Sequence, residues 1–107
     1  MVLKKEIIAV FSTAPPDKSE SLARMLVDKR LAACVNIVPV CSYYRWKGEF
    51  CKEPEHLLIA KTTKEKSGEV IAALKALHPY EVPEIITLPV TDGYPPYLEW
   101  MYQETQR

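Results

Sequence analysis

The sequence predicts an α+β fold in which strands and helices follow the order β-α-β-β-α-β, with one more helix at the end. Three observations predict it: short runs of β-branched and aromatic residues bounded by proline or glycine, two stretches with apolar residues at helical spacing, and a long extended segment that turns back on itself. With 107 residues, 48% of them apolar, the chain is long enough for a single domain (1–107) with its own core.

The first part of the chain predicts a strand, a helix and half of a hairpin. Residues 7–11 are β-branched and aromatic, which predicts a buried strand. Asp17 stands three residues before Glu20, a variant of the capping box that predicts a helix at about 18–30. Residues 33–46 favour extended structure, and Pro39 inside them marks a bulge or the edge of a sheet.

The second part completes the order. Lys47 and Gly48 supply a turn, and Thr62 with Glu65 forms a second capping box. The elements predicted here are a strand at 57–60, a helix at 64–77, a strand at 84–88 and a helix at 97–103. Two β-α-β crossovers on one antiparallel sheet give the ferredoxin-like split arrangement.

The second strand is too long for the domain that carries it. Fourteen extended residues span roughly 46 Å, whereas a globule of this chain length has a diameter of roughly 34 Å. The hairpin tip with Tyr43, Tyr44 and Trp46 therefore projects, and a projecting two-stranded ribbon with unpaired edges invites another chain. We expect these aromatics to form an interface in a closed oligomer. The alternative is a hairpin that curls onto its own helices.

Composition excludes several classes of protein. Fourteen Lys and Arg residues balance fourteen Asp and Glu residues, so the charge typical of a general nucleic-acid or anionic-membrane binder is missing. The longest uncharged apolar run, 7–11, is too short to cross a membrane, and the first six residues do not resemble a secretory signal. These features predict a cytoplasmic protein.

Three cysteines without a C-x-x-C pair predict free thiols.

Two segments hold candidate ligands for a metal ion. Residues 78–84 place an imidazole, a phenol and two carboxylates (His78, Tyr80, Glu81, Glu84) in a junction stiffened by two prolines. One interpretation is that this segment lines a pocket or a metal site. The other is that it only connects a helix to a strand. Cys34 shares one strand face with Asn36. It is either a small buried hydrophobe or a metal or redox ligand.

Other chemistry is represented more weakly. Lys61 precedes Thr62 and Thr63 where a strand is expected to meet a helix, so this helix start could hold an anion or simply be capped. Arg45, Trp46 and Lys47 could stack a base, or Trp46 could be an interface aromatic. No nucleophile elbow, phosphate-binding glycine loop or H-E-x-x-H motif occurs.

Several of these segments together resemble the CutA-type divalent-cation tolerance proteins. The matching pieces, in the family's order, are 31–36 (LAACVN), 44–48 (YRWKG), 61–63 (KTT), 78–85 (HPYEVPEI), 88–90 (LPV) with Gly93, and 97–100 (YLEW). They cover nearly the whole chain.

The resemblance implies a non-catalytic homotrimer similar to the PII signalling regulators, with hairpins that lock neighbours together and ligand clefts between subunits. It also implies a response to divalent metal, with Cu²⁺ as the ion. Cys34 and His78 match two positions of a copper site proposed in the family, with Glu81 and Tyr80 nearby. The third position, a cysteine in the family, is Ser12 here, so one soft ligand is lost.

The alternative function is a sensor of a small anion or metabolite bound between subunits, with Lys61, Thr62 and Tyr80 in the cleft. An enzyme of unknown reaction and a structural anchor for a membrane or cellular partner are further classes that the sequence leaves open.

Overall fold

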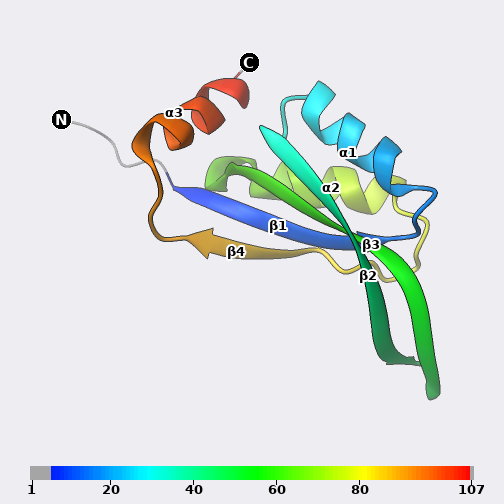
Figure 1. Cartoon of the computed structure of the whole chain (residues 1–107). Coiled ribbons are helices and arrows are strands. Elements are labelled where there is room, and N and C mark those ends of the chain that lie inside the picture. The colour runs from blue at the N-terminus through cyan, green and yellow to red at the C-terminus, as the bar shows by residue number, and fades with distance from the viewer. Residues whose placement is uncertain (1–5, 107) are drawn as a thin grey trace.

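The computed structural model describes residues 6–106; the expectation about the first six residues concerns a segment that lies almost wholly outside them. The elements are β1 (Ile7–Ala14), α1 (Ser19–Asp28), β2 (Cys34–Trp46), β3 (Glu49–Thr63), η1 (Lys64–Lys66), α2 (Ser67–Leu77), β4 (Ile86–Val90) and α3 (Pro95–Glu104). Figure 1 shows the labelled helices and strands in the predicted order. The short element η1 is a single 3₁₀ turn between β3 and α2. The α+β fold and the order of its elements are confirmed.

One sheet forms the body of the molecule. In the described part of the chain it has four strands in the order β2-β3-β1-β4, and all its neighbouring pairs are antiparallel. Helices α1 and α2 cover one face, and α3 lies at the end of the sheet where β1 begins (Figure 1). The core forms between that face and the two helices, with Leu26 of α1 and Leu74 of α2 against Val10 and Leu58 of the sheet. Each of these four side chains is almost fully buried.

Pro39 does not interrupt β2. The register between β2 and β3 runs one to one from Cys34↔Lys61 to Trp46↔Glu49, without a bulge. The strand tolerates proline because β2 is the edge strand, and a residue without an N–H loses nothing where its N–H would face away from the ladder. Of the two possibilities that the sequence left open for Pro39, the edge is confirmed.

Both predicted capping boxes are wrong. The N-cap residues of α1 and α2 are Lys18 and Lys66, and neither makes a capping hydrogen bond through its side chain. The hydroxyl of Thr62 instead donates to the carbonyl of Leu31 at 2.7 Å. Pairing with β1 extends β3 as far as Thr63, so the strand includes residues that the local sequence assigns to a helix start.

The hairpin of β2 and β3 projects beyond the rest of the domain, as predicted. The molecule measures 54 × 25 × 21 Å along its principal axes, and Figure 1 shows the hairpin tip extending away from the sheet and helices. Large side chains on it are exposed to solvent, with Tyr43 at 62% and Phe50 at 71%. A single chain therefore leaves much of this apolar surface uncovered.

Candidate functional site

A groove lies between the hairpin and the connector that joins α2 to β4. Its volume is about 610 Å³, within the range of small-molecule sites. The side facing it from the hairpin consists of Ser42, Tyr43, Tyr44, Trp46 and Glu55, and the opposite side of Thr13, Pro79, Tyr80, Glu81, Val82 and Glu84. The groove thus joins the two segments that the sequence marked out independently, the aromatic hairpin and the junction at 78–84.

Strand alternation selects the hairpin residues that face the groove. Side chains two apart on a strand share a face, so Tyr44 and Trp46 lie together, and the register places Glu55 opposite Val40 on that face. Tyr43 also borders the groove, but strand alternation assigns its side chain to the other face, where its ring lies 6.4 Å from that of Phe50. The three predicted interface aromatics are therefore divided between two surfaces.

The connector is held in place by His78. The side chain is buried, its Nδ1 accepts the backbone N–H of Tyr80 at 3.2 Å, and its Nε2 lies 2.8 Å from the carbonyl oxygen of Thr13. A neutral imidazole has one donor and one acceptor, so this pattern requires the hydrogen on Nε2, which donates to Thr13. Both nitrogens are occupied by backbone partners, and His78 acts as an anchor of the connector.

Tyr80 and Glu55 join the two sides of the groove. The Tyr80 hydroxyl donates to Oε2 of Glu55 at 2.5 Å. Burial, followed by the hydrogen bond and negative charge of Glu55, raises the pKa of Tyr80 well above its usual value of 10.0. Tyr80 therefore stays a neutral donor at physiological pH.

Glu81 and Glu84 lie on the connector side. At the rim, Glu81 forms an exposed ion pair with Lys47 of the hairpin turn, at 3.6 Å between Oε1 and Nζ. The Lys47 nitrogen also lies 5.6 Å from the centre of the Trp46 ring. Glu84 accepts a hydrogen bond from the Thr13 hydroxyl at 3.3 Å.

The predicted metal ligands do not gather at one place in the chain. Cys34 pairs with Lys61, whereas His78 contacts Thr13, which pairs with Leu57. Lys61 and Leu57 are four residues apart on β3, or roughly 13 Å at the usual rise of a strand. Among residues 6–106, no three His, Cys, Asp or Glu side chains converge as a metal site. Ser12 is only 1% exposed, so the position of the missing cysteine is part of the core.

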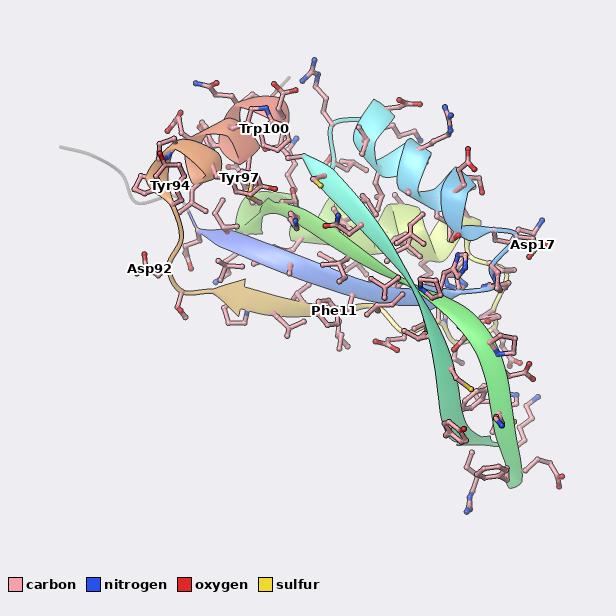
Figure 2. All side chains as sticks on the ribbon, in the orientation of Figure 1. Phe11, Asp17, Asp92, Tyr94, Tyr97 and Trp100 are labelled. Atoms are coloured by element: carbon pink, nitrogen blue, oxygen red, sulfur yellow. The ribbon has the colours of Figure 1, made fainter. Side chains whose placement is uncertain are left out.

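The predicted anion residues are also separated. Thr62 is fully buried and bonded to Leu31, and η1 separates Lys61 from the first turn of α2. The Lys61 nitrogen lies 5.8 Å from the ring centre of Tyr97 on α3, and Figure 2 shows Tyr97 at the end of the molecule opposite the hairpin tip. Tyr80 is bonded to Glu55. Glu55 is seven residues along β3 from Thr62, which is roughly 23 Å at the usual rise of a strand.

Sequence reasoning missed Glu55, the most buried carboxylate of the groove. The polar stretch 49–56 has no strand signal of its own, so the local pattern predicts a strand only over 57–60. A signal was available: continuing the pairing outward from the 57–60 strand places residue 55 opposite Val40, on the face of Tyr44.

A β-α-β-β-α-β chain with a projecting hairpin and a groove beside that hairpin is a ferredoxin-like module of distinctive shape. The chain matches the family model described as CutA1 divalent ion tolerance protein over residues 7–104. It belongs to that family, and the resemblance drawn from the sequence is confirmed.

Relatives in distant organisms share most of this chain. The divalent-cation tolerance protein CutA of Thermus thermophilus is 46% identical over 98 residues, covering 90% of this chain and 95% of the relative. Protein CutA of Mus musculus is 43% identical over 102 residues, which are 94% of this chain but 58% of the mouse protein. The chain thus spans little more than half the length of that relative.

Solved structures confirm the fold. CutA of Xylella fastidiosa is 40% identical with a TM-score of 0.90, covering 94% of this chain and 98% of its own. The PII-like protein CutA of Nostoc sp. PCC 7120 is 35% identical with a TM-score of 0.88, and the match covers 94% of this chain and 97% of the Nostoc chain. Relatives include one named as chloroplastic and one as periplasmic. Within residues 6–106, none of the helices has the length and apolarity required to cross a membrane.

Proposed function

We propose that this chain is a non-catalytic, cytoplasmic homotrimer that responds to divalent metal by binding it, with Cu²⁺ as the preferred ion. Membership of the divalent ion tolerance family supports the response to metal. The projecting hairpin is the observation that carries the assembly, because it leaves aromatic side chains exposed that a single copy cannot cover. Three copies, as in the PII regulators that the fold resembles, would bury those side chains.

Cys34 is the strongest candidate ligand. It is a free, half-buried thiol on the edge strand, and its closest polar contact is a weak one, from Sγ to Asn36 Oδ1 at 4.0 Å. Thiolate sulfur suits copper and zinc. Glu81 is the next candidate, since its carboxylate is exposed and pairs with an equally exposed Lys47. His78 would have to release one of its two backbone partners before it could bind a metal.

A titration with matched cysteine variants tests the metal site. Calorimetry with Cu²⁺ under anaerobic conditions, and with redox-inert Zn²⁺, compares wild type with Cys34→Ser and with Cys41→Ser, whose thiol is exposed on the hairpin. We expect Cys34→Ser alone to weaken binding, by about tenfold or more for the loss of one ligand. Equal affinity in all three proteins would remove Cys34 from the site.

The assembly is tested separately by light scattering. A homotrimer has three times the chain mass of 12.2 kDa. Replacing both exposed aromatics of the outer hairpin face, in Tyr43→Ser/Phe50→Ser, should shift the mass toward the monomer. A wild-type monomer at micromolar concentration would refute the assembly without affecting the metal titration.

The alternative sensor of a small anion receives no specific support from the groove, because the charged side chains that line it within residues 6–106 are carboxylates. A thermal-shift screen in metal-free buffer separates the two functions. Stabilisation by an anion, with no effect of Cu²⁺, would favour the sensor.

A further inference from the structure

We propose that the groove between the hairpin and the connector binds a small organic cation, a primary ammonium carried on an apolar or aromatic body, with the carboxylate of Glu55 as its counter-ion. This site is distinct from the Cys34 position; Glu81, a candidate metal ligand, also lines the groove, so the test below is made without metal.

The first step concerns the buried carboxylate of Glu55. The residue is only 6% exposed, and the Tyr80 hydroxyl is its hydrogen-bond donor. Among residues 6–106, the ion pairs involve other carboxylates, and none of them joins a cation to Glu55. A buried carboxylate is costly unless it is paired and hydrogen-bonded. The second oxygen of Glu55 is therefore available to a cation that enters the groove.

The second step concerns the sign of the surrounding charge. Glu81 and Glu84 also line the groove, and no lysine or arginine of the described chain is among its lining residues. The pKa of Tyr44 is raised, first by burial and then by its neighbours, among them the carboxylates of Glu53 and Glu55. This surface attracts cations and repels anions.

The third step concerns the aromatic rings. Tyr44, Trp46 and Tyr80 line the same groove, and aromatic faces attract ammonium groups. The chain's own Lys47 demonstrates the mode at the rim: its ammonium lies 5.6 Å from the Trp46 ring centre and 3.6 Å from the Glu81 carboxylate. A ligand ammonium placed deeper would find the same pair of partners, an aromatic face and a carboxylate.

Size distinguishes an organic cation from a bare metal ion. The groove holds about 610 Å³, far more than one ion needs, and within residues 6–106 its carboxylates do not converge as a metal site. The apolar part of the lining, which includes Pro79 and Val82, would contact the body of the ligand while Glu55 binds its charged end.

The experiment compares two probes of the same shape that differ in charge. Benzylamine is protonated at neutral pH and benzyl alcohol is neutral. Binding to the full chain is measured by ligand-observed NMR and calorimetry in buffer with EDTA, so that failure here leaves the Cu²⁺ titration unaffected. We expect benzylammonium to bind about tenfold or more tightly than benzyl alcohol.

Charge-neutral variants locate the site. Glu55→Gln keeps an acceptor for Tyr80 but loses the charge, and should weaken benzylammonium binding by about tenfold or more. Glu20→Gln, an equal loss of charge on α1, is the control and should bind as wild type does. Lys47→Gln releases Glu81 and should bind at least as tightly as wild type. If Glu55→Gln does not fold by circular dichroism, Glu84→Gln, at the solvent side of the groove, replaces it with a smaller expected loss in the same direction.

Three results would overturn the proposal: equal affinity for the two probes, equal affinity of wild type and the Glu55 or Glu84 variant, or no binding of benzylammonium at millimolar concentration.

Discussion

Removal of a buried hydroxyl should have opposite effects at two adjacent threonines, Thr62 and Thr63, at the end of β3. Both are buried, at 0% and 2% exposure. The Thr62 hydroxyl donates to the Leu31 carbonyl at 2.7 Å, whereas the Thr63 hydroxyl has no hydrogen-bond partner among the described residues. Valine replaces each hydroxyl by a methyl group of similar size, so the two substitutions differ mainly in the hydrogen bond.

The magnitudes follow from that difference. Thr63→Val relieves the burial of an unsatisfied hydroxyl, which should raise the free energy of unfolding by about 1–2 kcal/mol. Thr62→Val removes a hydrogen bond and leaves the Leu31 carbonyl without this donor. The free energy of unfolding should therefore fall by about 1–2 kcal/mol. The two variants should therefore differ by about 3 kcal/mol, or roughly 12–24 °C in Tm for a domain of this size.

The assay is urea unfolding followed by circular dichroism, with wild type and both variants at one protein concentration because assembly couples stability to concentration. Equal m-values would show that the comparison concerns stability and not a change in the denatured state. Shifts of the two variants in the same direction, or a Thr63→Val protein less stable than wild type, would refute the reasoning.

Three other predictions concern stability and titration. Ser12→Ala removes a second buried hydroxyl without a partner among the described residues and should stabilise the protein by about 1 kcal/mol in thermal melts; a lower Tm would contradict it. Gly48→Ala should destabilise the protein by about 1 kcal/mol because Gly48 has a φ of +82°. Gly68→Ala should stabilise it by about 0.5–1 kcal/mol, because Gly68 is in a helix and no atom lies within 4 Å of the added Cβ. Shifts of Tm in the same direction for both variants would refute this pair of predictions. Tyr80 has a raised pKa, so its phenol should ionise as a separate late phase when tyrosine titration is followed by ultraviolet absorbance. The contribution of the neutral phenol to stability should be full below about pH 10 and lost as the pH rises further. Tyr80→Phe should remove the late phase, and an unchanged titration curve would contradict the prediction.

Much of the fold could be predicted from local patterns. The β-branched run before Pro15, the helical stripes and the Lys47-Gly48 turn gave the order of the elements, because each depends on residues close together in the chain. The length of the 33–46 segment gave the projecting hairpin. The groove could be predicted in part, since the aromatic hairpin supplies Tyr44 and Trp46 to its lining and the 78–84 junction supplies Tyr80.

The remaining features depended on contacts between distant segments. Thr62 has the sequence context of a helix cap, yet pairing with β1 places its hydroxyl against Leu31, 31 residues away. The family resemblance assigns Cys34 and His78 to one metal site, but in this chain they lie against different parts of β3.

The sequence by itself determined the succession of strands and helices and the overhang of the hairpin, because periodicity, turn chemistry and length are local properties. Only the tertiary structure decided that Glu55 faces Tyr80 across a groove and that His78 uses both nitrogens to hold the connector. Those roles depend on strand register and on which backbone groups lie within hydrogen-bond distance, and no spacing along the chain encodes them.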